Sequence, residues 1–323
     1  MAGKFNNKTL IIVLIVLVGL FLVTRAFKQK KSAGTLKAEL VQIDTSHVNS
    51  ILLYPSAEQG EEITFARTGD EWTVQKGELI VPADDYGINN MLTELLNLAP
   101  ERLVANSSEK WGDFGVTDSL GTRVIMKDGK KTLADVMIGR FDYQPSQNPY
   151  GGYGRNQGTG LTYVRLTGEP QVYVIEGFLA MSFNQAFNSW RNQLVVRLEK
   201  NNINRITFEY PADTGFIAEN PDSVWRINGI PADSTSIENY LNSLARKSNS
   251  SFVDGYNPVT GPDYQITIEG NLVAPVVIKA YQRSADNFII HSSMNPESYF
   301  SSNLTGLFSQ LFKSRAEMLA GDS

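Results

Sequence analysis

The first strong pattern along the chain is an unbroken apolar run near its N-terminus. Residues 10–23 contain no charged side chain and only one glycine, and basic residues flank the run on both sides. A helix over residues 9–27 would be about 28 Å long, close to the roughly 30 Å hydrocarbon core of a bilayer. The pattern therefore predicts a single transmembrane helix, with an anchor formed by Leu10, Ile11, Leu14, Leu17, Phe21 and Val23.

Two other interpretations of this run stay open. Its apolar length would suit a cleaved signal peptide, but the small residues at 32–34 come only after the charged stretch 28–31, which makes a poor cleavage region. A buried core helix is the third possibility. The run is apolar on all sides and basic at both ends, which is not typical of a helix packed on one face in a globular domain.

The rest of the chain alternates β-rich runs with two amphipathic helical patterns, and the order of patterns repeats. Each half has a strand ending in Tyr-Pro, a short strand centred on Trp, a Pro-Ala-Asp sequence and a helical stripe of spacing i, i+4, i+7. Such a repeat predicts one module used twice. The paired segments are 48–55 with 203–211, 70–74 with 223–227, 81–84 with 230–233, 88–95 with 237–244, 102–104 with 251–253, 125–129 with 266–270, 136–138 with 276–278 and 170–173 with 296–299.

The Pro-Ala-Asp sequences predict where the two main helices begin. Proline ends the preceding strand because it cannot donate to a sheet ladder. The following aspartate can accept hydrogen bonds from the first free N–H groups of a helix, and its charge suits the positive helix end. We therefore expect Asp84 and Asp233 to be helix caps.

These patterns predict an α+β fold: an N-terminal transmembrane helix followed by two similar modules of mostly antiparallel strands, with one main helix each. The predicted divisions are a basic tail and transmembrane helix at 1–27, a tether at 28–46, a first module at 47–187, a linker at 188–202, a second module at 203–315 and a tail at 316–323.

Composition limits the chemistry and the partners. The 323 residues include no cysteine, which excludes disulfides, thiolate metal sites and a cysteine nucleophile. They include two histidines, so a multi-histidine metal site is not expected. The seven positive charges of residues 1–37 are unopposed, which leaves a net charge of −12 on residues 38–323. An acidic body repels nucleic-acid phosphates, so no nucleic-acid partner is expected, whereas the basic flanks favour an anionic lipid surface.

Motifs for catalysis are missing from the sequence, which contains neither a phosphate-binding G-x-x-x-x-G-K-[ST] loop nor a G-x-S-x-G elbow. No catalytic residue, cofactor or metal is therefore predicted. One segment, 143–160, is rich in Gly, Tyr, Asn and Gln. Its length and composition are consistent with a long surface loop. They are also consistent with an interaction loop, because tyrosine gives contact area at low entropic cost. Its candidate contact residues are Tyr143, Tyr150, Tyr153 and Arg155.

Several of these motifs together resemble the domain-of-unknown-function family 4340. They are the basic N-terminus with one apolar span, the Val-Asn-Ser-Ile strand, the Gly-Asp-Glu-Trp strand, the Pro-Ala-Asp helix start, the stretch Trp111–Val116, the Ile138-Gly139 turn and the strand Thr162–Arg165. The resemblance covers about residues 40–300. It implies a bacterial membrane-anchored protein linked to ABC-type transport, including the auxiliary component of gliding motility, and it implies no catalytic residues.

The function predicted on this basis is a membrane-anchored, non-catalytic accessory protein that assists an ABC-type transporter or cell-envelope complex through protein–protein contacts. Its expected partners are the lipid bilayer and other membrane or envelope proteins. Basic residues are nearly balanced across the apolar run, so the positive-inside rule does not decide orientation. The resemblance implies a single-pass protein with its body outside the cytoplasm. The alternative is a solute-binding protein or enzyme with a cleft between its modules.

Overall fold

The computed structural model of the protein describes residues 38–145 and 158–320. The apolar run and its six predicted anchor residues lie outside the described residues. Within 38–145 and 158–320, no helix has the length and hydrophobicity needed to cross a bilayer. Contacts divide the described residues into two compact units. The first comprises 38–67, 88–145 and 158–185, and the second comprises 68–87 and 186–320.

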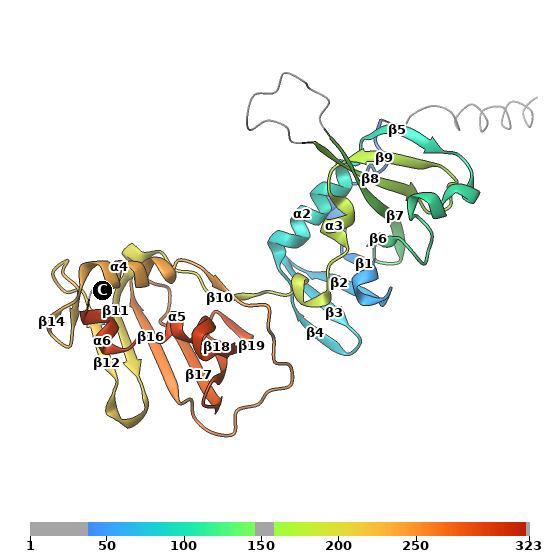
Figure 1. The fold of residues 1–323 in the computed structure, drawn as a ribbon. Coiled ribbons are helices and arrows are strands. Elements are labelled where there is room, and N and C mark those ends of the chain that lie inside the picture. Colours follow the sequence, from blue (N-terminus) through green and yellow to red (C-terminus); the bar gives the residue numbers. More distant parts are fainter. Residues whose placement is uncertain (1–37, 146–157, 321–323) are drawn as a thin grey trace, which may run out of the picture. The chain divides into compact units, whose positions relative to one another are not determined.

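The first sheet has nine strands in the order β4-β3-β2-β1-β6-β7-β8-β9-β5 (Figure 1). Residues alternate between buried and half-buried along β1, as expected for a strand with one face on a core. Helix α2 covers part of the sheet with the buried residues Ile88, Met91, Leu92 and Leu95. The elements are β1 Ser50–Tyr54, β2 Ile63–Thr68, β3 Glu71–Lys76, β4 Leu79–Pro82, α2 Asp85–Leu96, β5 Pro100–Ala105, β6 Thr122–Asp128, β7 Lys131–Gln144, β8 Thr159–Leu166, β9 Val172–Glu176 and α3 Leu179–Phe183.

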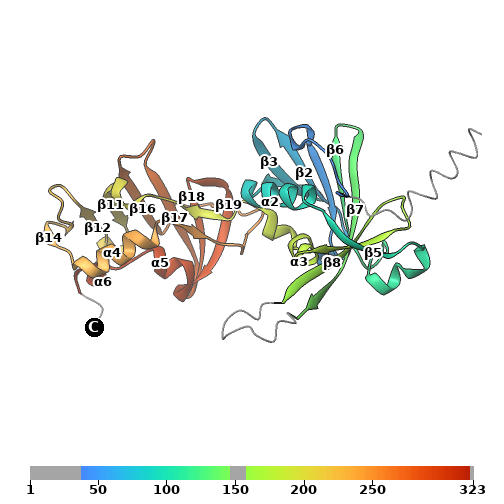
Figure 2. The ribbon, with the colours of Figure 1, turned by 90° about the horizontal axis from the view of Figure 1, so that it is seen from above.

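The second sheet has eight strands in the order β14-β13-β12-β11-β16-β17-β18-β19 (Figure 2). Its core joins apolar residues of these strands to helix α4 and to the C-terminal helices. The elements are β10 Leu194–Val196, β11 Ile203–Glu209, β12 Phe216–Glu219, β13 Arg226–Ile227, β14 Ile230–Pro231, α4 Ser234–Ser243, β15 Lys247–Ser248, β16 Tyr264–Gly270, β17 Val276–Ser284, β18 Asn287–Ser292, β19 Asn295–Asn303, α5 Ser309–Leu311 and α6 Arg315–Leu319.

Mostly antiparallel sheets with a few helices confirm the predicted α+β class. The segment 188–202, predicted as a linker, contains strand β10, which pairs with β15. Val195 and Val196 of this strand are fully buried in the core of the second unit. Burial of these apolar side chains in a core is favourable in free energy, whereas an exposed linker would leave them in water.

The strands from β4 to β9 follow the same order in the first sheet as the strands from β14 to β19 in the second, and the first sheet adds β5. Trp72 lies in β3, whereas Trp225 stands directly before the two-residue strand β13 and is not its centre. Beyond each Trp the pairing is alike, since Val74 opposes Val81 and Ile227 opposes Ile230. The backbone N–H after each Pro donates to the carbonyl of the Trp, at 3.0 Å from Ala83 to Trp72 and at 2.9 Å from Ala232 to Trp225. At the other end of the sheets, the β5–β9 pair Leu103–Tyr173 has a counterpart in the isolated bridge Phe252–Phe300.

The two predicted cap residues take different local roles. Asp233 immediately precedes α4, and its side chain accepts a hydrogen bond of 2.8 Å from Ser236 N. The backbone hydrogen bond from Ser236 lowers the pKa of Asp233. Asp84 immediately precedes α2, and its backbone N–H donates to Trp190 O at 2.9 Å. The carboxylate of the next residue, Asp85, accepts from Trp72 N at 3.3 Å.

Removing the Asp233 carboxylate should weaken α4. We expect Asp233→Ala to lower the melting temperature by roughly 2–4 °C, because one helix N–H loses its acceptor, whereas Asp233→Asn, which keeps an acceptor, should stay close to wild type. A lowered folded-state pKa stabilises the fold above the unfolded-state pKa, and this contribution is lost as pH falls. The melting curves of wild type and Asp233→Ala should therefore converge in acid, and equal curves at neutral pH would contradict a capping role.

Candidate functional site

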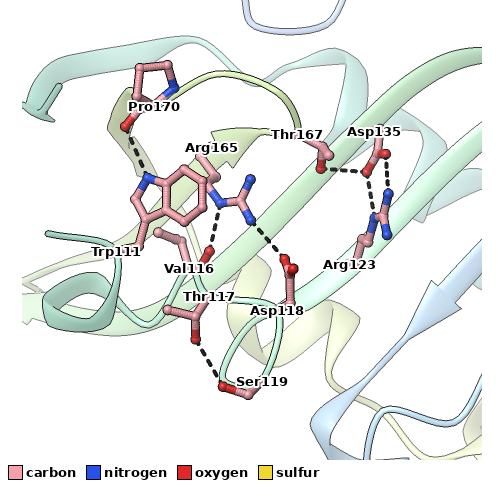
Figure 3. Close-up of polar contacts among 10 residues, drawn as sticks. All are labelled: Trp111, Val116, Thr117, Asp118, Ser119, Arg123, Asp135, Arg165, Thr167 and Pro170. Atoms are coloured by element: carbon pink, nitrogen blue, oxygen red, sulfur yellow. Dashed lines mark hydrogen bonds and ion pairs between the residues drawn. The ribbon is translucent and has the colours of Figure 1, made fainter. Parts of the chain in front are cut away.

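Three segments that are far apart in the sequence meet around the buried side chain of Arg165 in the first unit. They are the stretch 111–118, the β7 residue Gly139 and the β8 residues Tyr163 and Arg165 (Figure 3 shows the polar part). Nearby apolar residues of β7, β8 and β9 form a cluster with Val116, and Trp111 packs against it. We call this arrangement the Arg165 cluster, comprising Trp111, Phe114, Val116, Asp118, Gly139, Tyr163 and Arg165.

Arg165 is held on several sides. Its Nε donates to Val116 O at 2.7 Å, and its Nη2 lies 3.0 Å from Asp118 Oδ1. The guanidinium carbon lies 3.9 Å from the centre of the Trp111 ring, in the geometry of a cation–π contact. The indole Nε1 in turn donates to Pro170 O at 3.1 Å (Figure 3). The Arg165 side chain is 3% exposed, whereas Asp118 is 87% exposed.

Glycines let the 111–118 stretch approach the sheet closely. Gly115 has a φ of +67°, a conformation that side chains disfavour. A Cβ on Gly139 would stand 2.4 Å from Phe114 O, so no larger residue fits there without moving the backbone. The Phe114 ring packs on Tyr163 with centroids 4.8 Å apart. The Phe-Gly-Val and Ile-Gly sequences thus have a packing role that brings Val116 O to Arg165.

A second ion pair lies beside the cluster. Arg123 forms two parallel hydrogen bonds with Asp135, of 3.0 Å from Nε and 2.7 Å from Nη2. Thr167 Oγ1 donates to the same carboxylate at 2.7 Å. These contacts join β6, β7 and the end of β8 (Figure 3). A bidentate pair of this kind fixes geometry as well as charge.

Burial and charge act in opposite directions on these groups. Burial lowers the pKa of Arg165, and the nearby Asp118 opposes that change. For Asp135, burial alone would raise the pKa, but hydrogen bonds from Arg123 and Thr167 bring it below its usual value. The hydrogen bond to Asp135 raises the pKa of Arg123. Both arginines therefore remain cations at neutral pH, and they bind and position groups without transferring protons.

The Arg165 cluster is built to hold a loop in one conformation. Its polar groups engage one another, and the stretch they fix ends at the exposed Asp118. Leu120, two residues further on, is 59% exposed. Among the described residues, no group of three or more His, Asp or Glu is placed to hold a metal ion.

The second unit contains another buried arginine. Arg191 makes two hydrogen bonds with Asp254, of 2.7 and 3.0 Å, and a third of 3.2 Å with Asn188 Oδ1. Its guanidinium carbon lies 3.6 Å from the centre of the Phe252 ring. The Arg191 side chain is 2% exposed and that of Asp254 45%. This contact joins the segment before β10 to the connection that follows β15.

Of the residues predicted for the interaction loop, only Tyr143 lies in the described part of the chain. It is 51% exposed near the end of β7, and its hydroxyl accepts from Gly158 N at 2.8 Å. Tyr150, Tyr153 and Arg155 lie outside the described residues, as do the six anchor residues.

Sequence reasoning did not single out Arg165 or Arg191 as site residues. The signal for Arg165 was present, because it is the one charged residue in the apolar strand 161–166. A charge in such a strand is expected to be paired, since an unpaired buried charge is very unfavourable. Its partners lie 49 and 47 residues away along the chain, so the sequence pattern does not identify them.

A half-buried carboxylate in the first unit gives a pH-dependent prediction. Burial raises the pKa of Glu94 on α2, partly opposed by a hydrogen bond of 3.3 Å from Ser182 Oγ. Its Oε2 is buried and has no hydrogen-bond partner among the described residues. A raised folded-state pKa stabilises the fold in acid, and this contribution is lost as pH rises through that pKa.

We therefore expect Glu94→Gln to be more stable than wild type at neutral pH, by up to about 4 °C in melting temperature, and to lose that advantage in acid. The matched control is Glu101→Gln on β5, where the side chain is exposed. Thermal unfolding across pH measures both variants. A Glu94→Gln curve parallel to wild type at every pH would contradict the prediction.

The fold and the Arg165 cluster define an α+β protein with two antiparallel sheets and a loop fixed by a buried cation. The family model described as domain of unknown function (DUF4340) matches residues 72–266. This match covers more than half of the chain, so the chain belongs to that family. Comparisons with curated proteins and with solved structures give no match.

Proposed function

We propose that this protein is a membrane-anchored, non-catalytic accessory protein with its body outside the cytoplasm. In this role it assists an ABC-type transporter or cell-envelope complex through protein–protein contacts. The apolar run at 10–23, with basic residues on both sides, supports the anchor. The acidic body supports contact with proteins in preference to nucleic acid or an anionic lipid surface.

The proposal depends on one observation: the buried Arg165 guanidinium holds the stretch 111–118 against the sheet. The cation is 3% exposed and donates to a loop carbonyl and to Asp118. The cost of burying it is offset by contacts that keep the stretch 111–118 in place. The loop that follows presents an exposed apolar side chain, Leu120. A preorganised apolar group is the kind of feature that partner proteins contact.

The test is co-purification of the full chain from detergent-solubilised native membranes, with bound proteins identified by mass spectrometry. We expect wild type to retain ABC-transporter or envelope subunits and Leu120→Asp to lose them. The matched control is Ile80→Asp, since Ile80 is equally exposed at 57% but lies on β4. If both variants retain the same subunits as wild type, the contact surface is elsewhere; if wild type retains none, the accessory role is wrong.

Membrane attachment and orientation need a separate measurement. We expect the full chain to stay with the membrane fraction and a chain without residues 1–27 to leave it. In intact spheroplasts, added protease should reach the body, because the body is placed outside the cytoplasm. A body that resists protease until the spheroplasts are broken would reverse the orientation without affecting the anchor.

We further propose that the two sheets arose by duplication of one module. The shared order of β4 to β9 and of β14 to β19, the matching strand pairing next to the two Trp residues and the paired Ala-to-Trp hydrogen bonds support this origin. Aligned homologues provide the test. If the duplication preceded the family, distant members should retain Trp and Pro-Ala-Asp at both 72–84 and 225–233, and a lineage with an unrelated second sheet would contradict it.

A further inference from the structure

The second unit contains a cavity between helix α4 and the C-terminal helices α5 and α6, which lie close together in Figures 1 and 2. Its volume is about 220 Å³. Four residues of α4 at helical spacing form one wall, and residues from β15, α5 and α6 form the other. The lining residues are Ser236, Asn239, Tyr240, Ser243, Lys247, Gln310, Lys313, Glu317 and Met318.

The charges around this cavity leave one cation without a countercharge. Lys313 Nζ lies 3.3 Å from Glu317 Oε1, so these two side chains compensate each other. Lys247 Nζ donates to Gln310 Oε1 at 2.8 Å, and that acceptor is neutral. The lining therefore carries a net charge of about +1 in a body that is acidic as a whole.

One hydroxyl group in the lining is not satisfied. Ser243 Oγ is buried and has no hydrogen-bond partner among the described residues. Buried hydroxyl groups in folded proteins normally have a partner, and an exception calls for an explanation such as a bound molecule. By contrast, the hydroxyl of Tyr240 is already used, since it donates to Leu311 O at 2.8 Å. The nearly buried Tyr240 and Met318 provide the apolar surface of the cavity.

We propose that this cavity binds a small organic carboxylate. Its oxygens accept hydrogen bonds from Lys247 Nζ and, once the buried Ser243 hydroxyl rotates toward the cavity, from Ser243 Oγ. Its apolar part packs against Tyr240 and Met318. One unopposed cation matches a monoanion better than a phosphate ester, which carries about −1.5 to −2 charges at neutral pH. The volume is below the roughly 300 Å³ at which pockets begin to hold drug-sized ligands, so the acid is small. The site is independent of the membrane anchor and of the Leu120 surface.

Methyl NMR on the full chain in detergent tests this binding directly. The chain has seven methionines, so ¹³C-methyl labelling gives few signals, and Met318→Leu identifies the signal of Met318. We expect the Met318 methyl signal to shift on titration with benzoate, with a Kd of about 1 mM or tighter. Benzamide, which has the same ring without the charge, should leave it in place.

Two lysine variants complete the test. Lys247→Met should weaken benzoate binding about tenfold or more, whereas Lys200→Met should not, because Lys200 pairs with Glu238 and does not line the cavity. The other methionine signals report whether each variant is folded. Four outcomes would each overturn the proposal. Two are a Met318 signal that benzoate does not move and an equal response of this signal to benzamide. The others are a response to inorganic phosphate but not to benzoate, and unchanged benzoate binding by a folded Lys247→Met.

Discussion

Arg165→Met is expected to lower the free energy of unfolding of the first unit by roughly 3 kcal/mol. Methionine fills much of the arginine volume but cannot donate to Val116 O, so a buried carbonyl loses a charged partner at a cost of about 1.5–3 kcal/mol. Loss of the contact with the Trp111 ring adds about 1 kcal/mol. Denaturant unfolding measures the change. Hydrogen exchange should localise it to residues 106–121.

Arg165 is buried and its partner Asp118 is exposed, so the two substitutions should differ in their effect on stability. Asp118 is 87% exposed, so Asp118→Asn should cost no more than about 1 kcal/mol, as exposed ion pairs usually do. Arg165→Lys should not restore stability, because an ammonium cannot donate from Nε and stack at the same time. Arg102→Met, at an exposed position on β5, is the control. Similar losses for Arg165→Met and Asp118→Asn would refute the assignment of the main contribution to Val116 and Trp111.

In the second unit, Arg191→Met is expected to cost about 3 kcal/mol. The guanidinium is 2% exposed and makes a bidentate pair with Asp254, and breaking a buried pair typically costs 3–5 kcal/mol. We place the value at the low end because Asp254 is 45% exposed and water can solvate it after the change. The measurement is again denaturant unfolding, with hydrogen exchange at 248–256.

In this pair, unlike the Arg165–Asp118 pair, we expect loss of the carboxylate to lower the free energy of unfolding. Asp254→Asn leaves the buried Arg191 with a neutral partner, so it should lose about as much stability as Arg191→Met, and the double variant should lose little more than either single one. Arg246→Met, an exposed arginine in the same unit, is the control. Additive losses in the double variant would mean that the two side chains act separately.

Local sequence signals predicted several elements of the fold. Alternation and proline punctuation predicted the strand around Trp72 and a short strand next to Trp225, which begins one residue later. The i, i+4, i+7 stripe predicted the buried face of α2. These signals work because they depend on neighbours within a few residues. The helix starts were predicted equally well, with Asp84 and Asp233 each directly before its helix.

The Arg165 cluster and the cavity could not be predicted in the same way. Arg165 depends on a carbonyl and an aromatic ring supplied by a distant loop, and sequence does not say which loop returns to which strand. The cavity depends on how α5 and α6 pack beside α4, which no periodicity encodes. The short strand β10 was read as a connection because three apolar residues are too few for a clear pattern.

The two sheets differ in the connection that follows Leu103 in one and Phe252 in the other. In the first it contains two short 3₁₀ turns and the stretch held by Arg165, and in the second it passes through Asp254 to β16. The strands on either side keep the same order in both. This position is therefore a natural grafting point, where a foreign peptide could be displayed on an unchanged scaffold provided that it brings its own tether to the sheet.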